Sequence, residues 1–254
     1  MVIFIRKILK GELYMNVLLE ISRGLYKGDH FLYIFISTAL CTALIVLSMI
    51  FVKGEKPRKI ILKVIAGLLF IAILTNRLSQ VFRYAEVRWY LLIPDSFCGT
   101  TSLVLSLAVL LGKRNNCVLH FVWLLGLFGG ISTVVYPTFV DQGPSIFYLP
   151  TISGLVHHSL CATLVILLLV FKQIDITYKK WYYTLFGFTC YLTLGAFLMS
   201  VPQFNITDAF HIKDPIISGT FLTAWGMAPI YAIAYGLILL IVELVRRKKQ
   251  NKAK

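Results

Sequence analysis

Acidic residues are scarce in this chain, which has 11 Asp and Glu against 25 Lys and Arg in 254 residues and a formal net charge of +14. The basic residues gather in short segments between apolar runs, without the interleaved aromatic residues of a nucleic-acid-binding surface. Basic segments of this kind are typical of loops that lie against anionic lipid head groups. The charge pattern therefore predicts membrane lipids as partners and excludes nucleic acid.

The sequence also lacks the motifs of common cofactor and metal sites. Its five cysteines show no C-x-x-C spacing of a zinc or redox site, and no glycine-rich loop is present that would hold a phosphate. A metal ion at His157 and His158 would need a carboxylate, which only Asp95 could offer within the apolar runs. We therefore expect no cofactor and no metal site.

Long polar stretches are missing, so no soluble domain, internal repeat or long linker is predicted. Hydrophobic residues make up 58% of the chain, and the mean hydropathy is +0.81. A helix that crosses the hydrocarbon core, about 30 Å thick, needs roughly 20 apolar residues. The apolar runs are Phe31–Val52, Ile60–Thr75, Trp89–Leu111, Val118–Phe139, Ile146–Phe171, Tyr182–Val201 and Ser218–Val245.

These runs predict an all-α polytopic membrane protein, a bundle of seven transmembrane helices over residues 31–246 followed by a basic tail, residues 247–254. The second run is the weakest, because Asn76 and Arg77 interrupt it at its end. Gly126 and Gly130 lie four residues apart in the fourth run, and such small residues predict a close helix crossing.

The segment of residues 1–30 precedes the first run and has neither the apolar core nor the cleavage site of a signal peptide. Lys10, Gly11 and Glu12 are what a ribosome-binding sequence would encode if it were translated in frame, and Met15 follows at a suitable distance. We expect the native chain to start at Met15 and to come from a bacterium. In the alternative, the segment is amphipathic and lies against lipid head groups.

The distribution of Lys and Arg predicts the orientation, because these residues collect in short cytoplasmic loops. With seven spans, the first, third and fifth loops and the C-terminal tail share one side. We predict a cell-membrane protein with the N-terminus outside and the C-terminus cytoplasmic. The basic residues on the predicted cytoplasmic side are Lys53, Lys56, Arg58, Lys59, Lys113, Arg114, Lys172, Lys179, Lys180 and residues 246–249.

Two adjacent histidines, His157 and His158, lie near the middle of an apolar run. Ionisable groups at the bilayer midplane are costly, so they usually face a protein-lined cavity and mark a functional site. Ser153, His157 and Cys161 recur at every fourth position and therefore share one helix face. By contrast, His30, His120 and His211 lie near the ends of runs, and we expect them to be solvated.

The third run carries a matching polar face, where Cys98 is followed by Ser102 at i+4 and preceded by Asp95. If the third and fifth helices pack, the Cys98 thiol and the His157 imidazole lie at compatible depths. The imidazole can then take the thiol proton, and the thiolate can accept an acyl group. Alternatively, the histidine forms a hydrogen bond that joins two packed helices, and the thiol is an unreactive buried side chain.

Several features together resemble one family across nearly all of the predicted spans. In order and spacing they are similar to the YwaF-type integral membrane proteins, relatives of the vertebrate transmembrane protein 164. The features are His30 before the first run, Pro94 followed by Cys98, Gly129-Gly130 and Tyr136-Pro137 in the fourth run, His157 in the fifth, then Asn205, Pro215 and the stretch from Trp225 to Tyr231.

The resemblance implies acyl transfer on membrane phospholipids, with a lipid or acyl donor as substrate. It implies Cys98 as the nucleophile and His157 as the base, with His158 as the alternative base. The residues expected to support these groups are Asp95, Ser96, Thr100 and Ser153, with Ser96, Thr100 or backbone amides stabilising the oxyanion. The residues expected to line the substrate site are Tyr136, Asn205, Trp225 and Tyr231.

This chain also departs from the family pattern next to the cysteine. Bacterial members commonly have a histidine two residues before the cysteine and an aspartate directly after it, where this chain has Ser96 and Gly99. Two other classes of function therefore stay open. One is a transporter in which Asp95 and the histidines relay protons, although the sequence shows no inverted repeat. The other is a non-catalytic scaffold or sensor.

Overall fold

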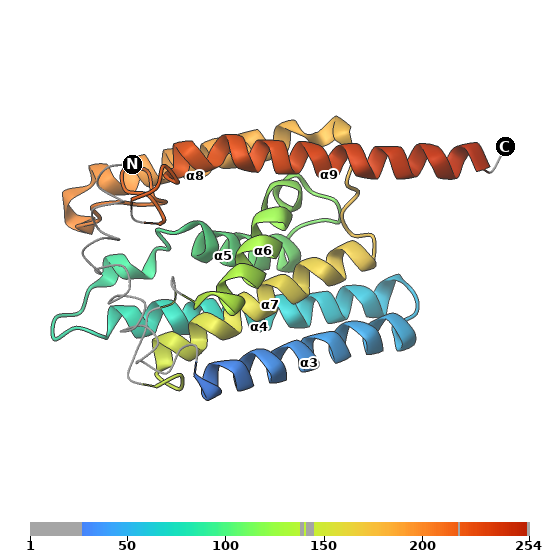
Figure 1. Ribbon diagram of the computed structural model, residues 1–254. Helices are drawn as coiled ribbons and strands as arrows, with labels where there is room; N and C mark the ends of the chain where they lie inside the picture. Colours follow the sequence, from blue (N-terminus) through green and yellow to red (C-terminus); the bar gives the residue numbers. More distant parts are fainter. Residues whose placement is uncertain (1–26, 138–139, 141–144, 218, 253–254) are drawn as a thin grey trace.

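The computed structural model describes residues 27–137, 140, 145–217 and 219–252, and its regular elements there are all helices (Figure 1). Six of the α-helices are long and apolar enough to cross a membrane. The described chain is therefore an all-α, multi-pass membrane protein, as its apolar runs predict. The predicted start at Met15 lies outside the described residues. The α-helices are α3 (Gly28–Phe51), α4 (Glu55–Val81), α5 (Phe97–Leu110), α6 (Cys117–Val135), α7 (Leu149–Val170), α8 (Tyr182–Ser200) and α9 (Ala224–Lys252).

The third predicted span differs from the prediction, because its first part is not α-helical. The run begins with a short 3-10 helix, η1 (Trp89–Leu92), and α5 begins only at Phe97 and has 14 residues. At about 1.5 Å per residue, this length falls short of a hydrocarbon core of about 30 Å. Pro94 explains the break, because it has no backbone N–H and disfavours the helical conformation of the preceding residue.

The second run, the weakest of the seven, still forms a full-length span, since α4 continues through Asn76 and Arg77 to Val81. The Asn76 amide donates to the carbonyl oxygen of Pro150 at 3.0 Å and to Ser153 Oγ at 3.1 Å, both on α7. A buried amide that is hydrogen-bonded in this way carries little desolvation cost. The polar residue therefore joins two helices instead of ending one.

The centre of the bundle is α7, which packs against α3, α4, α5 and α6. The outer helices are covered far less, because α3 buries only His30 and Ser48. On the other side, α8 packs against α6, and α9 lies along α8 and extends past the other helices at its C-terminal end (Figure 1). The exposed apolar side chains of these outer helices match a lipid environment.

The predicted close crossing at Gly126 and Gly130 is confirmed. A Cβ atom added at Gly130 would lie 2.7 Å from the backbone oxygen of His158 and 2.9 Å from Ala162 Cβ. One added at Gly126 would lie 3.1 Å from Cys161 Sγ. The absence of side chains at these positions lets α6 approach the backbone of α7 beside the two histidines.

The helices alternate in direction, so their connections gather at two ends of the bundle (Figure 1). We call one the basic end, which comprises residues 52–54, 111–116, 171–181 and the last turns of α9. We call the other the site end, which comprises residues 82–96, the described residues of 136–148, and 201–223.

Two of the histidines expected to be solvated are buried, and the expectation was wrong for both. His30, at the site end, has an exposed fraction of 0%, and its Nε2 lies 3.0 Å from the backbone oxygen of Val134. His120, at the basic end, has an exposed fraction of 1%, and its Nε2 donates to Asn115 Oδ1 at 2.7 Å. The hydrogen bond of His30 crosses the bundle to α6, whereas that of His120 reaches the loop just before α6, and each replaces water at Nε2.

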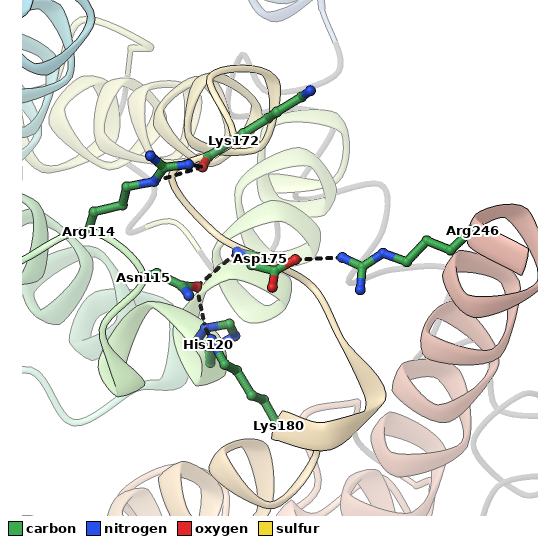
Figure 2. Close-up of polar contacts among 7 residues, drawn as sticks. All are labelled: Arg114, Asn115, His120, Lys172, Asp175, Lys180 and Arg246. Atoms are coloured by element: carbon green, nitrogen blue, oxygen red, sulfur yellow. Dashed lines mark hydrogen bonds and ion pairs between the residues drawn. The ribbon is translucent and has the colours of Figure 1, made fainter. Parts of the chain in front are cut away.

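A polar network at the basic end joins two connections, residues 111–116 and 171–181, to the last turns of α9 (Figure 2). Asn115 Oδ1 accepts hydrogen bonds from the backbone N–H of Asp175 at 2.9 Å and from His120. Asp175 in turn forms an ion pair with Arg246 of α9, and Arg114 donates to the carbonyl oxygen of Lys172 at 2.7 Å. Asn115 has a positive φ of 57°, which asparagine tolerates better than most residues.

We expect Asn115→Gly to lower the free energy of unfolding by about 1–3 kcal/mol, because it leaves the buried His120 imidazole and the Asp175 N–H without their acceptor. Glycine keeps the positive φ, so backbone strain at residue 115 does not contribute to the loss. Arg246→Gln is the control and should cost less than about 1 kcal/mol, since its ion pair is exposed. Unfolding of the detergent-solubilised protein measures both, and equal effects would contradict the assignment.

Candidate active site

The site is built around the start of α5, where the chain turns into the bundle. Ser96 is the N-cap of α5, and its Oγ accepts a hydrogen bond from the backbone N–H of Gly99 at 3.2 Å. Thr100 Oγ1 donates to the carbonyl oxygen of Pro94 at 3.1 Å. The backbone N–H of Phe210 donates to the carbonyl oxygen of Asp95 at 2.7 Å. These bonds fix the turn that precedes Cys98 and attach residues 201–223 to it.

Cys98 points from α5 towards α6. Its thiol forms a side-chain hydrogen bond with Thr133, and a Cβ atom added at Gly129 would lie 3.0 Å from its Sγ. Thr133 has an exposed fraction of 1%, whereas Cys98 is only partly buried and borders a cavity. The thiol is therefore held in place on one side and accessible on the other.

The two histidines on α7 lie on the same cavity and are both buried. Ser102 Oγ, one turn after Cys98 on α5, lies 3.3 Å from Nδ1 of His157. His158 forms a hydrogen bond with the backbone of Gly129, and the two imidazole ring centroids are 4.1 Å apart. The predicted polar faces of the third and fifth runs therefore do face each other.

Each reactive group has a different hydrogen-bond partner in the described part of the chain. Thr133 holds the thiol, Ser102 holds the His157 ring, and Gly129 holds the His158 ring. Because Gly129 also borders the Cys98 sulfur, the thiol and both imidazoles converge on one small region. No three His, Cys, Asp or Glu residues meet as a metal-ligand set among the described residues.

The cavity that these groups border has a volume of about 700 Å³ and reaches from α4 to α9. Most of its wall is apolar, formed by residues such as Leu125, Phe128, Phe188 and Ile230. A volume of this size is in the usual range for sites that enclose small-molecule ligands, about 300–1,000 Å³. The cavity fits a largely apolar ligand with a reactive group near the thiol.

The acidic residue predicted to support the site, Asp95, faces a basic residue. Asp95 Oδ1 lies 3.6 Å from Nη1 of Arg77, whose side chain has an exposed fraction of 16%. Arg77 borders the cavity, and its Nη2 would lie 3.8 Å from a Cβ atom added at Gly99. The carboxylate therefore pairs with a guanidinium at the cavity.

The other predicted residues divide between the cavity and its surroundings. Ser96 and Tyr231 line the cavity. Thr100 and Ser153 support it from behind, because Thr100 holds Pro94 and Ser153 binds Asn76. Three predicted lining residues lie on the exposed surface outside the cavity wall, namely Tyr136, Asn205 and Trp225.

Sequence reasoning did not assign roles to several residues of this site, chiefly Arg77, Gly129, Thr133 and His211. Arg77 carried a usable signal, because it is an ionisable residue at the end of an apolar run. Thr133 carried none, because its contact with Cys98 joins two helices that lie far apart in sequence. His211 was expected in solvent, but it is partly buried and lines the cavity.

The fold and the site define a class, namely multi-pass helical membrane proteins with a thiol and two imidazoles around a largely apolar cavity. The chain belongs to the TMEM164 family, which it matches over residues 25–245. The matched range includes α3 to α8, most of α9 and the whole described cavity, and it confirms the family resemblance. Comparison with curated proteins and with solved structures gave no match.

Proposed function

We propose that this protein is a membrane-embedded acyltransferase that acts on phospholipids through Cys98 and His157. The observation that supports this best is the convergence of one thiol from α5 and two imidazoles from α7 on one largely apolar cavity. A phospholipid can place acyl chains against the apolar wall and its ester at the polar end. Buried nucleophiles of this kind need a base within reach.

In the proposed reaction, His157 takes the thiol proton and the Cys98 thiolate attacks the ester carbonyl carbon. A carbon–sulfur bond forms, the ester carbon–oxygen bond breaks, and the leaving alkoxide takes the proton from the imidazolium. The hydroxyl of a second lipid then gives its proton to His157 and attacks the thioester carbonyl carbon. A carbon–oxygen bond forms, the carbon–sulfur bond breaks, and the Cys98 thiolate takes the proton back from the imidazolium. When the Nδ1–H group of His157 donates a hydrogen bond to Ser102 Oγ, the unprotonated Nε2 is the atom that can accept the thiol proton.

The oxyanion that forms in this step needs hydrogen-bond donors near Cys98. Ser96 borders the cavity, and its hydroxyl proton is free to donate while its oxygen caps α5. The backbone N–H groups of Phe97 and Cys98 are further candidates, because those of Gly99 and Thr100 in the same first turn already bind Ser96. Thr100 acts indirectly, since its hydroxyl already binds Pro94.

The proposal includes the orientation in the membrane. α5 and the segment before it count as the third of seven crossings, which places the basic end in the cytoplasm and the site end outside. Cys98 and His157 then lie within the outer half of the bilayer. This location would give the site access to lipids of the outer leaflet.

Comparative lipid analysis tests the proposal, with cells that carry wild-type protein, Cys98→Ala or His157→Ala at matched membrane levels. We expect wild type to shift the acyl composition of phospholipids and both variants to lose the shift. Removal of a general base typically lowers a rate about 10²- to 10⁴-fold. Identical profiles in all three would contradict the proposal. If His158→Ala lost the shift and His157→Ala kept it, the role of base would pass to His158.

A further inference from the structure

The cavity is polar at one end and apolar over most of its length. Its polar residues come mainly from the last turns of α4 and from the site end, namely Arg77, Gln80, Ser96 and His211. The apolar residues Ile230 and Ala234 lie further along α9, away from its start at the site end. An amphiphile whose head group lies at the site end matches this distribution.

Among the described residues that line the cavity, Arg77 is the only Lys or Arg. It has an exposed fraction of 16%, and a cation this far from water is stabilised by anionic groups. Its distance to Asp95 Oδ1 is 3.6 Å, and Nη1 lies 3.5 Å from the carbonyl oxygen of Leu91. Direct charge-assisted hydrogen bonds are shorter, about 2.7–2.9 Å, so these two contacts are weaker than a direct bond to a phosphate or carboxylate oxygen.

Arg77 lies close to the start of α5, which carries the Cys98 thiol. The guanidinium approaches Gly99, the residue directly after Cys98, where any side chain would narrow the space between them. A planar guanidinium presents two parallel N–H groups that match the oxygens of a phosphate or a carboxylate. A head group bound there would lie beside the reactive sulfur.

We infer that Arg77 is the anion-binding residue of this cavity and holds the oxyanion group of a lipid substrate, the phosphodiester of a phospholipid, next to Cys98. The inference rests on the proposed function for the cavity as the substrate site. Arg77 is a substrate-binding residue in this scheme, and Asp95 is a weaker competing anion that keeps it oriented. The same chemistry would also recognise the carboxylate of a fatty acid, so the experiment separates the two sources.

Lipid binding by the purified full-length chain in detergent tests the inference, in a Cys98→Ala background so that turnover plays no part. The probes are dioleoyl phosphatidylcholine, dioleoylglycerol, which lacks the phosphate, and oleic acid. We expect Arg77→Gln to weaken phosphatidylcholine binding about tenfold or more and to leave dioleoylglycerol binding unchanged. Arg83→Gln is the matched control, because Arg83 is an exposed cation of the same end outside the cavity.

The pattern of losses decides the outcome. A loss for phosphatidylcholine supports the phosphodiester, and a loss for oleic acid alone supports the same subsite with a carboxylate as its ligand. Equal binding of all three probes by Arg77→Gln and Arg83→Gln would overturn the inference. If Arg77→Gln does not fold, Asp95→Asn gives a second test. Removal of the competing carboxylate should strengthen phosphatidylcholine binding. Weaker binding by Asp95→Asn would overturn the inference. Since none of these variants needs turnover, a failed acyltransferase assay would leave this result intact.

Discussion

Cys98→Ala should abolish the acyl-enzyme completely. When the purified protein is incubated with phospholipid in mixed micelles, we expect wild type to gain the mass of one acyl chain and to lose it with hydroxylamine, which cleaves thioesters. Cys98→Ala removes the sulfur on which the thioester forms, so no adduct should appear. Loss of a nucleophile typically lowers a rate on the order of 10³- to 10⁶-fold. Intact-protein mass spectrometry measures the adduct directly.

Two matched variants separate chemistry from packing in this experiment. Cys161→Ala removes another buried thiol of the same region, one that hydrogen-bonds Ser102, and should keep the adduct. Cys98→Ser keeps the size of the side chain and a hydroxyl for Thr133, but an alkoxide is far harder to form than a thiolate, so the hydroxylamine-sensitive adduct should be lost. An adduct that persists in Cys98→Ala would remove Cys98 as the nucleophile, and an adduct on Cys161 that disappears only in Cys161→Ala would assign that role to Cys161.

Gly130→Ala should cause a clear loss of stability, because Gly130 lies where α6 crosses the backbone of α7. The added Cβ atom would lie 2.7 Å from the backbone oxygen of His158 and 3.0 Å from the backbone nitrogen of Ala162. Neither backbone atom can move without displacing α6 from α7. Overpacking of this kind typically costs about 1–3 kcal/mol. For a chain of this size, that corresponds to a fall in melting temperature of roughly 2–12 °C.

Glycines in open surroundings provide the controls for Gly130→Ala. Gly67 in α4 and Gly236 in α9 have nothing within 4 Å of an added Cβ atom, so alanine at either position should leave the melting temperature unchanged or raise it. Gly130→Leu should give no folded protein, because its side chain is larger still. Thermal unfolding of the detergent-solubilised variants measures all of these effects. A Gly130→Ala variant as stable as Gly67→Ala would contradict the close crossing of α6 and α7.

Local sequence features predicted some parts of the site for clear reasons. Cys98, His157 and His158 could be predicted as site residues, because polar or ionisable groups in an apolar run are costly in lipid and usually face a protein-lined cavity. Pro94 also carries the information for the break before α5, since it disfavours the helical conformation of the residue before it, whereas the apolar run alone predicts one continuous span. The close crossing at Gly130 followed from the spacing of small residues.

Other parts could not be predicted from local sequence. Whether a side chain faces the cavity depends on the rotation of its helix about its axis and on which helix packs against it. Thr133 reaches Cys98, and Ser153 turns to Asn76 instead of the cavity, because of contacts between helices far apart in sequence. Tyr136 and Trp225 lie outside the wall for the same reason.

By itself, the sequence determined the class of this protein, an all-helical membrane bundle, because the lengths and composition of apolar runs are local properties that the bilayer selects. It also identified Cys98, His157 and His158 as candidate site residues. Only the tertiary structure decided that Arg77, Cys98 and the two histidines share one cavity, because that depends on how α4, α5, α6 and α7 pack. Helix packing is set by many weak, non-local contacts, which no single segment encodes.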